Sequence, residues 1–315
     1  MNRQLKPLFI LGTALLLATA CTNDDTDTVD ITRPIDLHLS PARTVTAETK
    51  VAIDGEAFDP EDVIGLYLAW TDGATAQVPI AQTITQTTWK GNTFDGESLY
   101  WQNTADMHTL YAYYPYSANV EGYKVPVTLP DVQSADDEET CNILHGTFSG
   151  KAQNNVQIQM GHCMSLVNIT LNPGDGYQED GSDMPDIDKV DLIGDYRLSG
   201  TLDLGTGTVT ANGTNVYGIT TYLITPDTRD YRAILMPGET IDAIVITTDD
   251  GTTYSYMPET DTTTAANTQY NFTLELNKAG VELLKLNITP WSEKVITESG
   301  DANMDIEYEQ DSSPN

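Results

Sequence analysis

Residues 155–172, NVQIQMGHCMSLVNITLN, contain the pattern that decides the fold class. Val156, Ile158 and Met160 alternate with polar residues, and a second apolar run follows at residues 166–169. Alternation with a period of two places apolar side chains on one face of a strand and polar side chains on the other. The stretch therefore predicts two consecutive β-strands.

Similar short apolar runs continue on both sides of this stretch, and helical periodicity is scarce. Residues 63–70 (VIGLYLAW), 108–117 (HTLYAYYPYS) and 124–130 (KVPVTLP) are runs of this kind. Asp250-Gly251 lies between two alternating runs and is a strong hairpin signal. One helical turn is compatible with residues 277–282. Strands at near-regular spacing with turn residues between them are typical of a β-sandwich, so the sequence predicts an all-β fold.

Residues 172–188, NPGDGYQEDGSDMPDID, are the best candidate for a domain boundary. They are rich in Gly, Asp and Pro and offer few side chains that a core could bury. A chain of 315 residues is long enough for two domains of ordinary size. We therefore predict two tandem β-sandwich domains, at residues 44–172 and 173–291, and an extension at residues 292–315.

The first residues are typical of an export signal. A positively charged start and an apolar run at residues 8–17 precede the small residues Ala18-Thr19-Ala20. Cys21 follows directly, which predicts a bacterial lipoprotein signal over residues 1–20. A plain secretory signal that ends near Cys21 is the alternative. Residues 21–43 begin with a polar, acidic segment that we interpret as a solvated tether.

The charge balance excludes one large class of partner. The chain has 15 Lys and Arg residues against 47 Asp and Glu residues, which gives a net charge of -32 at pH 7. A phosphate backbone would be repelled, so we expect no nucleic-acid partner. The same charge argues against electrostatic binding to anionic headgroups, and it keeps an exposed protein soluble.

No catalytic or metal-binding constellation stands out, and the sequence holds no CxxC, HExxH or GxSxG motif. His162 stands beside Cys163, but a zinc site needs three or four ligands and no third one accompanies this pair. The acidic stretch 183–191 lacks the glycine and terminal glutamate of an EF-hand loop. We expect no enzyme activity, no metal and no cofactor, with His162 packed or hydrogen-bonded in a strand.

Cys141 and Cys163 leave two alternatives open. An exported protein can form a disulfide, but two cysteines do not make a disulfide scaffold. Two buried thiols on neighbouring strands explain the same residues equally well.

Two short segments near the ends of the chain share one pattern. IDLHL at residues 35–39 and MDIEY at residues 304–308 both follow the order apolar, Asp, apolar, polar, apolar. Each predicts a strand with one apolar face, and Ser40-Pro41 is expected to end the first of them. The apolar positions are Ile35, Leu37 and Leu39 in the first segment, and Met304, Ile306 and Tyr308 in the second. Two distant strands with similar faces can compete for one groove.

Several motifs in fixed order make the chain similar to the fimbrillin family of Bacteroidales. They cover nearly all of the chain after the leader, which itself belongs to the pattern. The motifs are YWQ (100–102), LYAYYPYS (110–117), GHCMSLVNITL (161–171), AILMPG (233–238), DGTTYSY (250–256) and LNITPW (286–291).

The resemblance implies a mechanism of assembly. Fimbrillins are exported as lipoproteins, here through Cys21, and reach the outer-membrane surface. A trypsin-like, arginine-specific protease then cuts near the N-terminus and removes the lipid together with a plug strand. Arg43, followed by Thr44, matches this site; Arg33 is the other candidate, but Pro34 disfavours cleavage there. A C-terminal donor strand of another subunit fills the opened groove, and a pilus grows.

The plug strand would be Ile35–Leu39, and the donor strand would contain Met304, Ile306 and Tyr308. The resemblance also implies transthyretin-like sandwich domains and other pilus subunits as partners. A donor extension together with a usable arginine favours a stalk or adaptor subunit. The alternative is a lipid-anchored surface adhesin or glycan-binding lipoprotein that does not polymerise. Exposed aromatic residues at 111–116 would favour this alternative, but we expect that cluster to be core.

Overall fold

The structure, a computed structural model, describes residues 28–41, 58, 62–71, 81–90, 93–96, 98–224 and 228–291. It confirms the all-β prediction, because strands dominate and the helical elements are a 3-10 turn, η2 (Ala135–Asp137), and one short helix, α1 (Glu138–Cys141). No helix in these ranges is long and apolar enough to cross a membrane.

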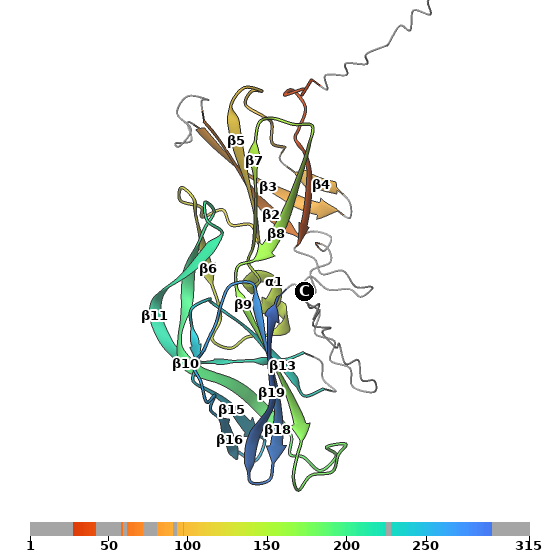
Figure 1. Cartoon of the computed structure of the whole chain (residues 1–315), viewed down its shortest axis with the longest axis vertical. Helices are drawn as coiled ribbons and strands as arrows, with labels where there is room; N and C mark the ends of the chain where they lie inside the picture. Colours follow the sequence, from red (N-terminus) through yellow and green to blue (C-terminus); the bar gives the residue numbers. More distant parts are fainter. Residues whose placement is uncertain are drawn as a thin grey trace, which may run out of the picture.

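The upper part of the molecule in Figure 1 is a seven-stranded sheet with the order β1-β8-β7-β5-β2-β3-β4. β1 pairs with β8 in parallel, and the other neighbours are antiparallel. The strands are β1 (Asp36–Pro41), β2 (Val63–Thr71), β3 (Ala81–Lys90), β4 (Thr93–Gly96), β5 (Met107–Tyr114), β7 (Leu144–Gly150) and β8 (Asn155–His162).

Two further sheets form the lower part (Figure 1). The first has the order β11-β10-β15-β16, with β6 also paired to β10. Its strands are β6 (Lys124–Thr128), β10 (Ile187–Asp203), β11 (Thr208–Thr220), β15 (Ala243–Thr248) and β16 (Thr253–Tyr256). The second has the order β12-β13-β9-β18-β19. Its strands are β12 (Tyr222–Leu223), β13 (Asp230–Leu235), β9 (Ser165–Pro173), β18 (Thr268–Asn277) and β19 (Gly280–Pro290). A small ribbon of β14 (Thr240–Ile241) and β17 (Thr262–Thr263) completes the set.

Three clusters of buried apolar residues hold these sheets. One lies on the seven-stranded sheet and contains Leu39, Leu110 and Ile158. A second lies between the two lower sheets, where Val190 and Ile244 from β10 and β15 pack with Phe272 from β18. The third joins both parts, because it combines side chains of β2 and β5 with side chains of β6, β10 and β13 and with Trp291. We call this third cluster the junction core.

Two local predictions can be compared directly with the strands. The Asp250-Gly251 hairpin is confirmed, since β15 pairs with β16 across it and Gly251 has a φ of +84°, which glycine adopts without strain. A helical turn at residues 277–282 is wrong. β18 pairs directly with β19 from Asn277 to Gly280, so Lys278 and Ala279 form a two-residue hairpin loop that leaves no room for a turn of helix.

The acidic, Gly-rich run at 172–188 contains the end of β9, the loop at residues 174–186 and the start of β10, and these two strands lie in the two different lower sheets. The chain enters a lower sheet first with β6, and it changes for the last time from the upper sheet to a lower one between His162 and Ser165, where β8 has ended and β9 pairs with β13 and β18. Turn-rich composition marks a loop of either kind, so it does not distinguish a domain border from a crossing between layers. The domain limits 44–172 and 173–291 stay a prediction.

Candidate functional site

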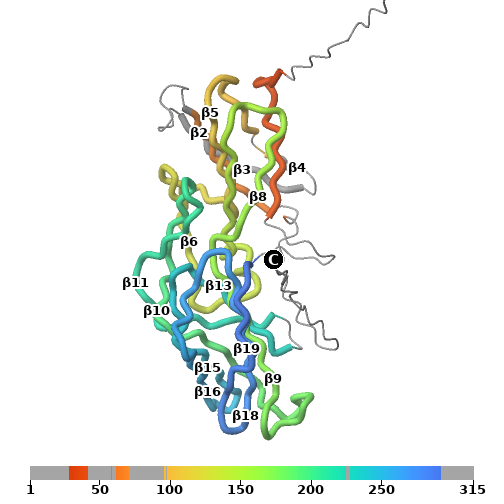
Figure 2. Tube along the Cα trace, viewed as in Figure 1, coloured from red at the N-terminus to blue at the C-terminus, as the bar shows by residue number. Residues whose placement is uncertain are grey.

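The strand expected at Ile35–Leu39 is present as β1, an edge strand of the seven-stranded sheet. It runs parallel to β8, with Leu37 opposite Val156 and Leu39 opposite Ile158. In Figure 2 it is the red segment alongside the green β8. Ser40 and Pro41 do not end the strand, contrary to the expectation, because they continue the pairing up to Met160. Proline is tolerated here because an edge strand has one side without a ladder.

The side chains of β1 alternate strictly between the core and solvent. Leu39 is 7% exposed and Pro41 is also buried, whereas Asp36, His38 and Ser40 are exposed. Ile35 and Leu37 are partly buried against the same apolar cluster. Full burial of one such aliphatic side chain contributes about 1.5–3 kcal/mol. β1 therefore covers apolar surface that the remaining strands of the sheet present.

The chain just before β1 is held by a backbone hydrogen bond and an exposed turn. Before the strand, the Ile35 N–H donates to the Leu99 carbonyl at 2.8 Å. Arg33 lies in an exposed turn with a guanidinium-to-carboxylate distance of 3.4 Å to Asp30. After the strand, the described chain stops at Pro41, two positions before Arg43. Arg43, Thr44 and Cys21 lie outside the described residues, so cleavage and lipidation at these positions stay predictions.

Trp291 is the last described residue, and the expected C-terminal extension follows it in the sequence. Trp291 is 2% exposed in the junction core, and its backbone N–H donates to the Asn267 carbonyl at 2.9 Å. The indole stacks on the His162 ring with centroids 4.2 Å apart and planes 8° apart. Met304, Ile306 and Tyr308 lie outside the described residues, so the donor strand also stays a prediction. The sequence did not reveal the Trp291–His162 contact, because no local pattern links residues so far apart.

His162 is a packed and hydrogen-bonded strand residue, as expected. Its Nδ1–H donates to the Asn142 Oδ1 at 2.7 Å, and burial lowers the pKa of the imidazole to about 4. Within the described ranges, no three His, Cys, Asp or Glu side chains gather into a group that could hold a metal ion. In the acidic stretch 183–191, Asp191 accepts from the Thr220 hydroxyl at 2.6 Å and pairs with Lys189 at 2.6 Å.

Cys141 and Cys163 are free thiols in this structure, and both are buried. Burial raises the pKa of the Cys141 thiol to about 11 and that of the Cys163 thiol to about 12. The thiolate is the reactive form of cysteine, so neither residue is poised as a nucleophile.

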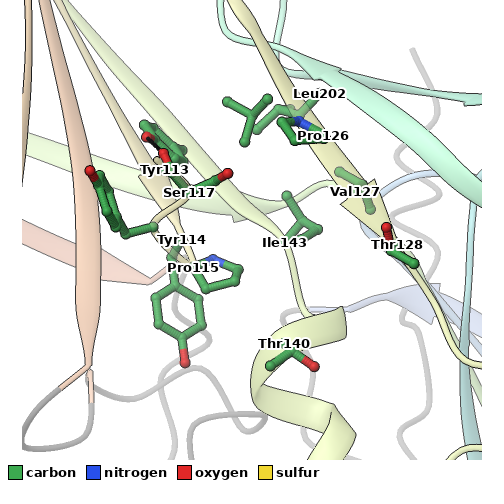
Figure 3. Close-up of a pocket in the computed structure, with 12 residues that line it drawn as sticks. Tyr113, Tyr114, Pro115, Ser117, Pro126, Val127, Thr128, Thr140, Ile143 and Leu202 are labelled. Atoms are coloured by element: carbon green, nitrogen blue, oxygen red, sulfur yellow. Dashed lines mark hydrogen bonds between the residues drawn. The ribbon is translucent and has the colours of Figure 1, made fainter. Parts of the chain in front are cut away.

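A cavity of about 230 Å³ lies beside the junction core (Figure 3). It is lined by the end of β5, the residues that follow it, β6, α1 and their neighbours. The Tyr113 hydroxyl donates to the Ser117 carbonyl at 3.0 Å, whereas Tyr114 packs in the apolar cluster of the seven-stranded sheet and its hydroxyl donates to Asp62 Oδ1 at 2.9 Å. The cavity is lined by apolar side chains and hydroxyl groups. This lining offers no acid–base pair.

The aromatic cluster at residues 111–116 is largely core, as expected. Tyr113 and Tyr114 are 1% and 5% exposed, and Tyr111 and Tyr116 are partly buried against the junction core. Tyr67, Tyr111 and Tyr123 pack with ring centroids 5.2–6.1 Å apart. These rings therefore join the upper sheet to the lower part and are not a sugar-binding platform on the surface.

Acid should destabilise the fold through His162. The unfolded chain gains a proton on this residue as the pH falls below about 6.5, whereas the folded chain gains it only near pH 4. Because the folded pKa is depressed, the free energy of unfolding falls as the pH drops through this window, by roughly 3 kcal/mol from this group. Burial lowers the pKa of His108 and His145 too, so both add in the same direction.

Urea unfolding at a series of pH values from 8 to 4 measures this effect. The slope of stability against pH should be smaller in His162→Phe, which keeps an aromatic ring against Trp291 but cannot take up a proton. An identical slope in this variant and in the unmodified chain would show that His162 is not the source.

Comparisons with known proteins place this arrangement in a family. A family model described as fimbrillin-like matches residues 49–291. A candidate cell adhesion protein from Bacteroides uniformis is 18% identical with a TM-score of 0.63, and the match covers 82% of this chain and 99% of that one. One from Bacteroides ovatus is 17% identical with a TM-score of 0.64 and coverage of 84% and 99%. These two show that the fold is shared.

A more distant structure is the tip fimbrial protein Mfa3 from Porphyromonas gingivalis. It is 9% identical with a TM-score of 0.48, and the match covers 82% of this chain and 100% of that one. The curated proteins contain no match to the chain.

Proposed function

The chain belongs to the fimbrillin-like family, and from this premise we propose that it is a pilus subunit of the cell surface that polymerises by strand exchange. The observation that carries the proposal is β1, a short edge strand whose apolar residues cover the sheet and which is followed by an arginine two positions later. Cleavage after Arg43 would leave β1 held only by its ladder and its buried side chains.

Loss of β1 would open a groove along β8. The backbone groups of residues 155–160 that face β1 would lose their partners, and such an edge accepts another strand. Beneath it lie Val156, Ile158 and Met160, which are at most 2% exposed while β1 is in place. A replacement strand would restore both the ladder and this burial.

The C-terminal extension is the proposed replacement. Met304, Ile306 and Tyr308 repeat the alternation of Ile35, Leu37 and Leu39, so one face of the tail matches the face that β1 buries. Residues 292–303 would connect this strand to Trp291 and can span about 40 Å when extended. The tail is therefore long enough to reach the groove of a neighbouring subunit.

The remaining elements of the proposal concern the route to the surface. Cys21 would carry a lipid in the outer membrane until an arginine-specific protease separates it from residues 44–315. A chain with both a cleavable arginine and a donor tail suits a stalk or adaptor subunit. The alternative, a lipid-anchored adhesin that never polymerises, lacks support from the aromatic cluster, since Tyr113 and Tyr114 are buried.

The N-terminus of the protein recovered from native cell surfaces tests this proposal. We expect the intact mass and N-terminal sequence of a chain that begins at Thr44, because Arg43 is the arginine that follows β1 in the sequence and Arg33 is followed by Pro34. A lipidated chain that begins at Cys21 in assembled pili would contradict the proposal and favour an anchored role.

A further inference from the structure

β11 is a long edge strand whose outer side has almost no partner among the described residues. It pairs with β10 on one side, and β15 and β6 occupy the opposite side of β10. In Figure 1 it forms the left margin of the lower part. At its end, Thr220 forms an isolated parallel bridge with Val132. The described chain meets the outer side of β11 at that point, and along residues 208–218 no described strand pairs with it.

The other edge strands of the described sheets carry features that discourage pairing with a second chain. Charged residues, proline and short length are such features. β1 contains Asp36 and Pro41, β6 contains Lys124 and Pro126, and β19 contains Glu282, Lys285 and Pro290. β4, β12 and β16 have only four, two and four residues.

β11 lacks these features. It has 13 residues, none of them charged or proline, and the chain carries no Asp, Glu, Lys, Arg or His between Asp203 and Asp227. Two shifts in its register against β10 interrupt the regular pairing, one beside Gly213, which has a φ of +88°, and one beside Tyr217.

Exposed apolar side chains gather at the same edge. Tyr217 of β11 is 74% exposed and Val132, which adjoins Thr220, is 63% exposed. They are two of the three most exposed large apolar side chains in the described residues, and the third, Met257, is 70% exposed. An exposed apolar group beside an unpaired backbone edge is typical of an interaction surface.

We propose that β11 is a lateral docking edge for a second copy of this chain, which pairs with it antiparallel about a two-fold axis. A two-fold contact uses the same surface of both copies. Each side chain of the strand therefore lies against side chains of the same strand in the second copy. Thr and Asn side chains both donate and accept hydrogen bonds, so they satisfy this condition, whereas charged side chains would repel. Because each copy carries a net charge of -32, an uncharged strip is where two copies approach at the smallest electrostatic cost.

The size of the edge determines how strong this contact is. A stable interface buries about 1,200–2,000 Å² in total, and one strand pair falls below that range. Isolated copies therefore associate weakly. In a filament, where the proposed function would place many copies in series, repeated weak contacts add up to firm side-by-side association. The contact between two isolated copies does not itself rest on the proposed function.

Sedimentation equilibrium of the purified, uncleaved chain at concentrations on the order of millimolar tests the contact. We expect a monomer–dimer equilibrium that tightens as salt is added, because salt screens the repulsion between the acidic copies. The double variant Thr214→Lys with Tyr217→Lys should weaken dimerisation at least tenfold. Leu284→Lys, at a 52% exposed position on β19, is the matched control and should leave it unchanged.

Amide hydrogen exchange on the unmodified chain gives a second readout that does not depend on how a variant folds. Exchange should slow with rising protein concentration in residues 208–218 and not along β19. A chain that stays monomeric at these concentrations overturns the proposal and leaves the edge to a different partner. Equal weakening by Leu284→Lys, or slowing at another strand, overturns it too. Arg43→Ala should dimerise normally, so a failed strand exchange and a failed β11 contact are distinguishable.

Discussion

Arg43→Ala should abolish polymer formation while leaving the folded monomer intact. The substitution removes the arginine that the protease requires, so β1 would stay covalently attached and its apolar side chains would keep the groove on β8 closed. Its six residues, paired along their whole length with β8, are then in effect tethered at high local concentration and outcompete any donor strand from another subunit. The measurement is the length distribution of pili on cells and of polymers assembled from purified protein.

Arg33→Ala is the matched control for this prediction. Arg33 is exposed and lies before β1, but Pro34 follows it, so its loss should leave assembly unchanged. Polymers of normal length from Arg43→Ala would show that β1 is not a removable plug. Loss of polymers in Arg33→Ala alone would place the cleavage on the other side of the strand.

Mixing two defective chains separates the two halves of the exchange. Arg43→Ala retains the tail and can donate a strand but cannot accept one. A cleaved chain truncated after residue 302 can accept but not donate. At concentrations far below millimolar, where the weak β11 contact does not form, each alone should remain monomeric, whereas the mixture should form a complex of two subunits that grows no further. Growth into long polymers, or no complex at all, would contradict the assignment of residues 304–308 as the donor.

Local patterns in the sequence were sufficient for the elements of this fold and insufficient for their arrangement. Alternation predicted β8, β9 and the β15–β16 hairpin, because side-chain period and turn chemistry act over a few residues. The same reasoning ended β1 too early at Ser40, since proline is excluded from central strands but not from an edge. It also offered a helical turn where β18 and β19 form a tight hairpin, because long-range pairing overrides a weak local preference.

One part of the candidate site could be predicted from the sequence, and the other part could not. The strand at residues 35–39 was predicted from its own alternation, and the structure places it at the edge of the upper sheet. The junction core could not be found, because it depends on contacts between Tyr67, Val127 and Trp291, which belong to distant parts of the chain. Sequence patterns report which face of an element is apolar, but they do not report which other element covers that face.

Trp291→Ala should be among the most destabilising single substitutions in the described residues. The indole is 2% exposed, stacks on His162 and lies in the junction core that joins the upper sheet to the lower ones. Truncating a buried tryptophan to alanine typically lowers the free energy of unfolding by about 3–5 kcal/mol, through lost burial and the cavity left behind. Urea unfolding at pH 8, where His162 is neutral in both states, measures the loss without the protonation effect.

Trp291→Phe is the control that separates ring stacking from size. It keeps an aromatic ring for His162 and removes the indole N–H, which is buried without a hydrogen-bond partner in the described structure. Removing the unsatisfied donor offsets part of the stability that is lost with the smaller side chain. The free energy of unfolding should therefore fall by much less than in Trp291→Ala. Equal losses of stability in both variants would mean that the indole stabilises the fold through contacts other than its stacking on His162.

The same substitution should also change the response to acid. Burial is what lowers the pKa of His162, and the Trp291 indole lies directly against one face of that ring. Removing the indole admits water, which raises the folded pKa towards its ordinary value and flattens the dependence of stability on pH between about 6.5 and 4. Trp291→Ala should therefore be less stable than the unmodified chain at pH 8 but lose less stability on acidification. An unchanged dependence of stability on pH would show that other parts of the junction core exclude water from the His162 ring. Trp291 would then contribute packing without shielding the histidine beneath it.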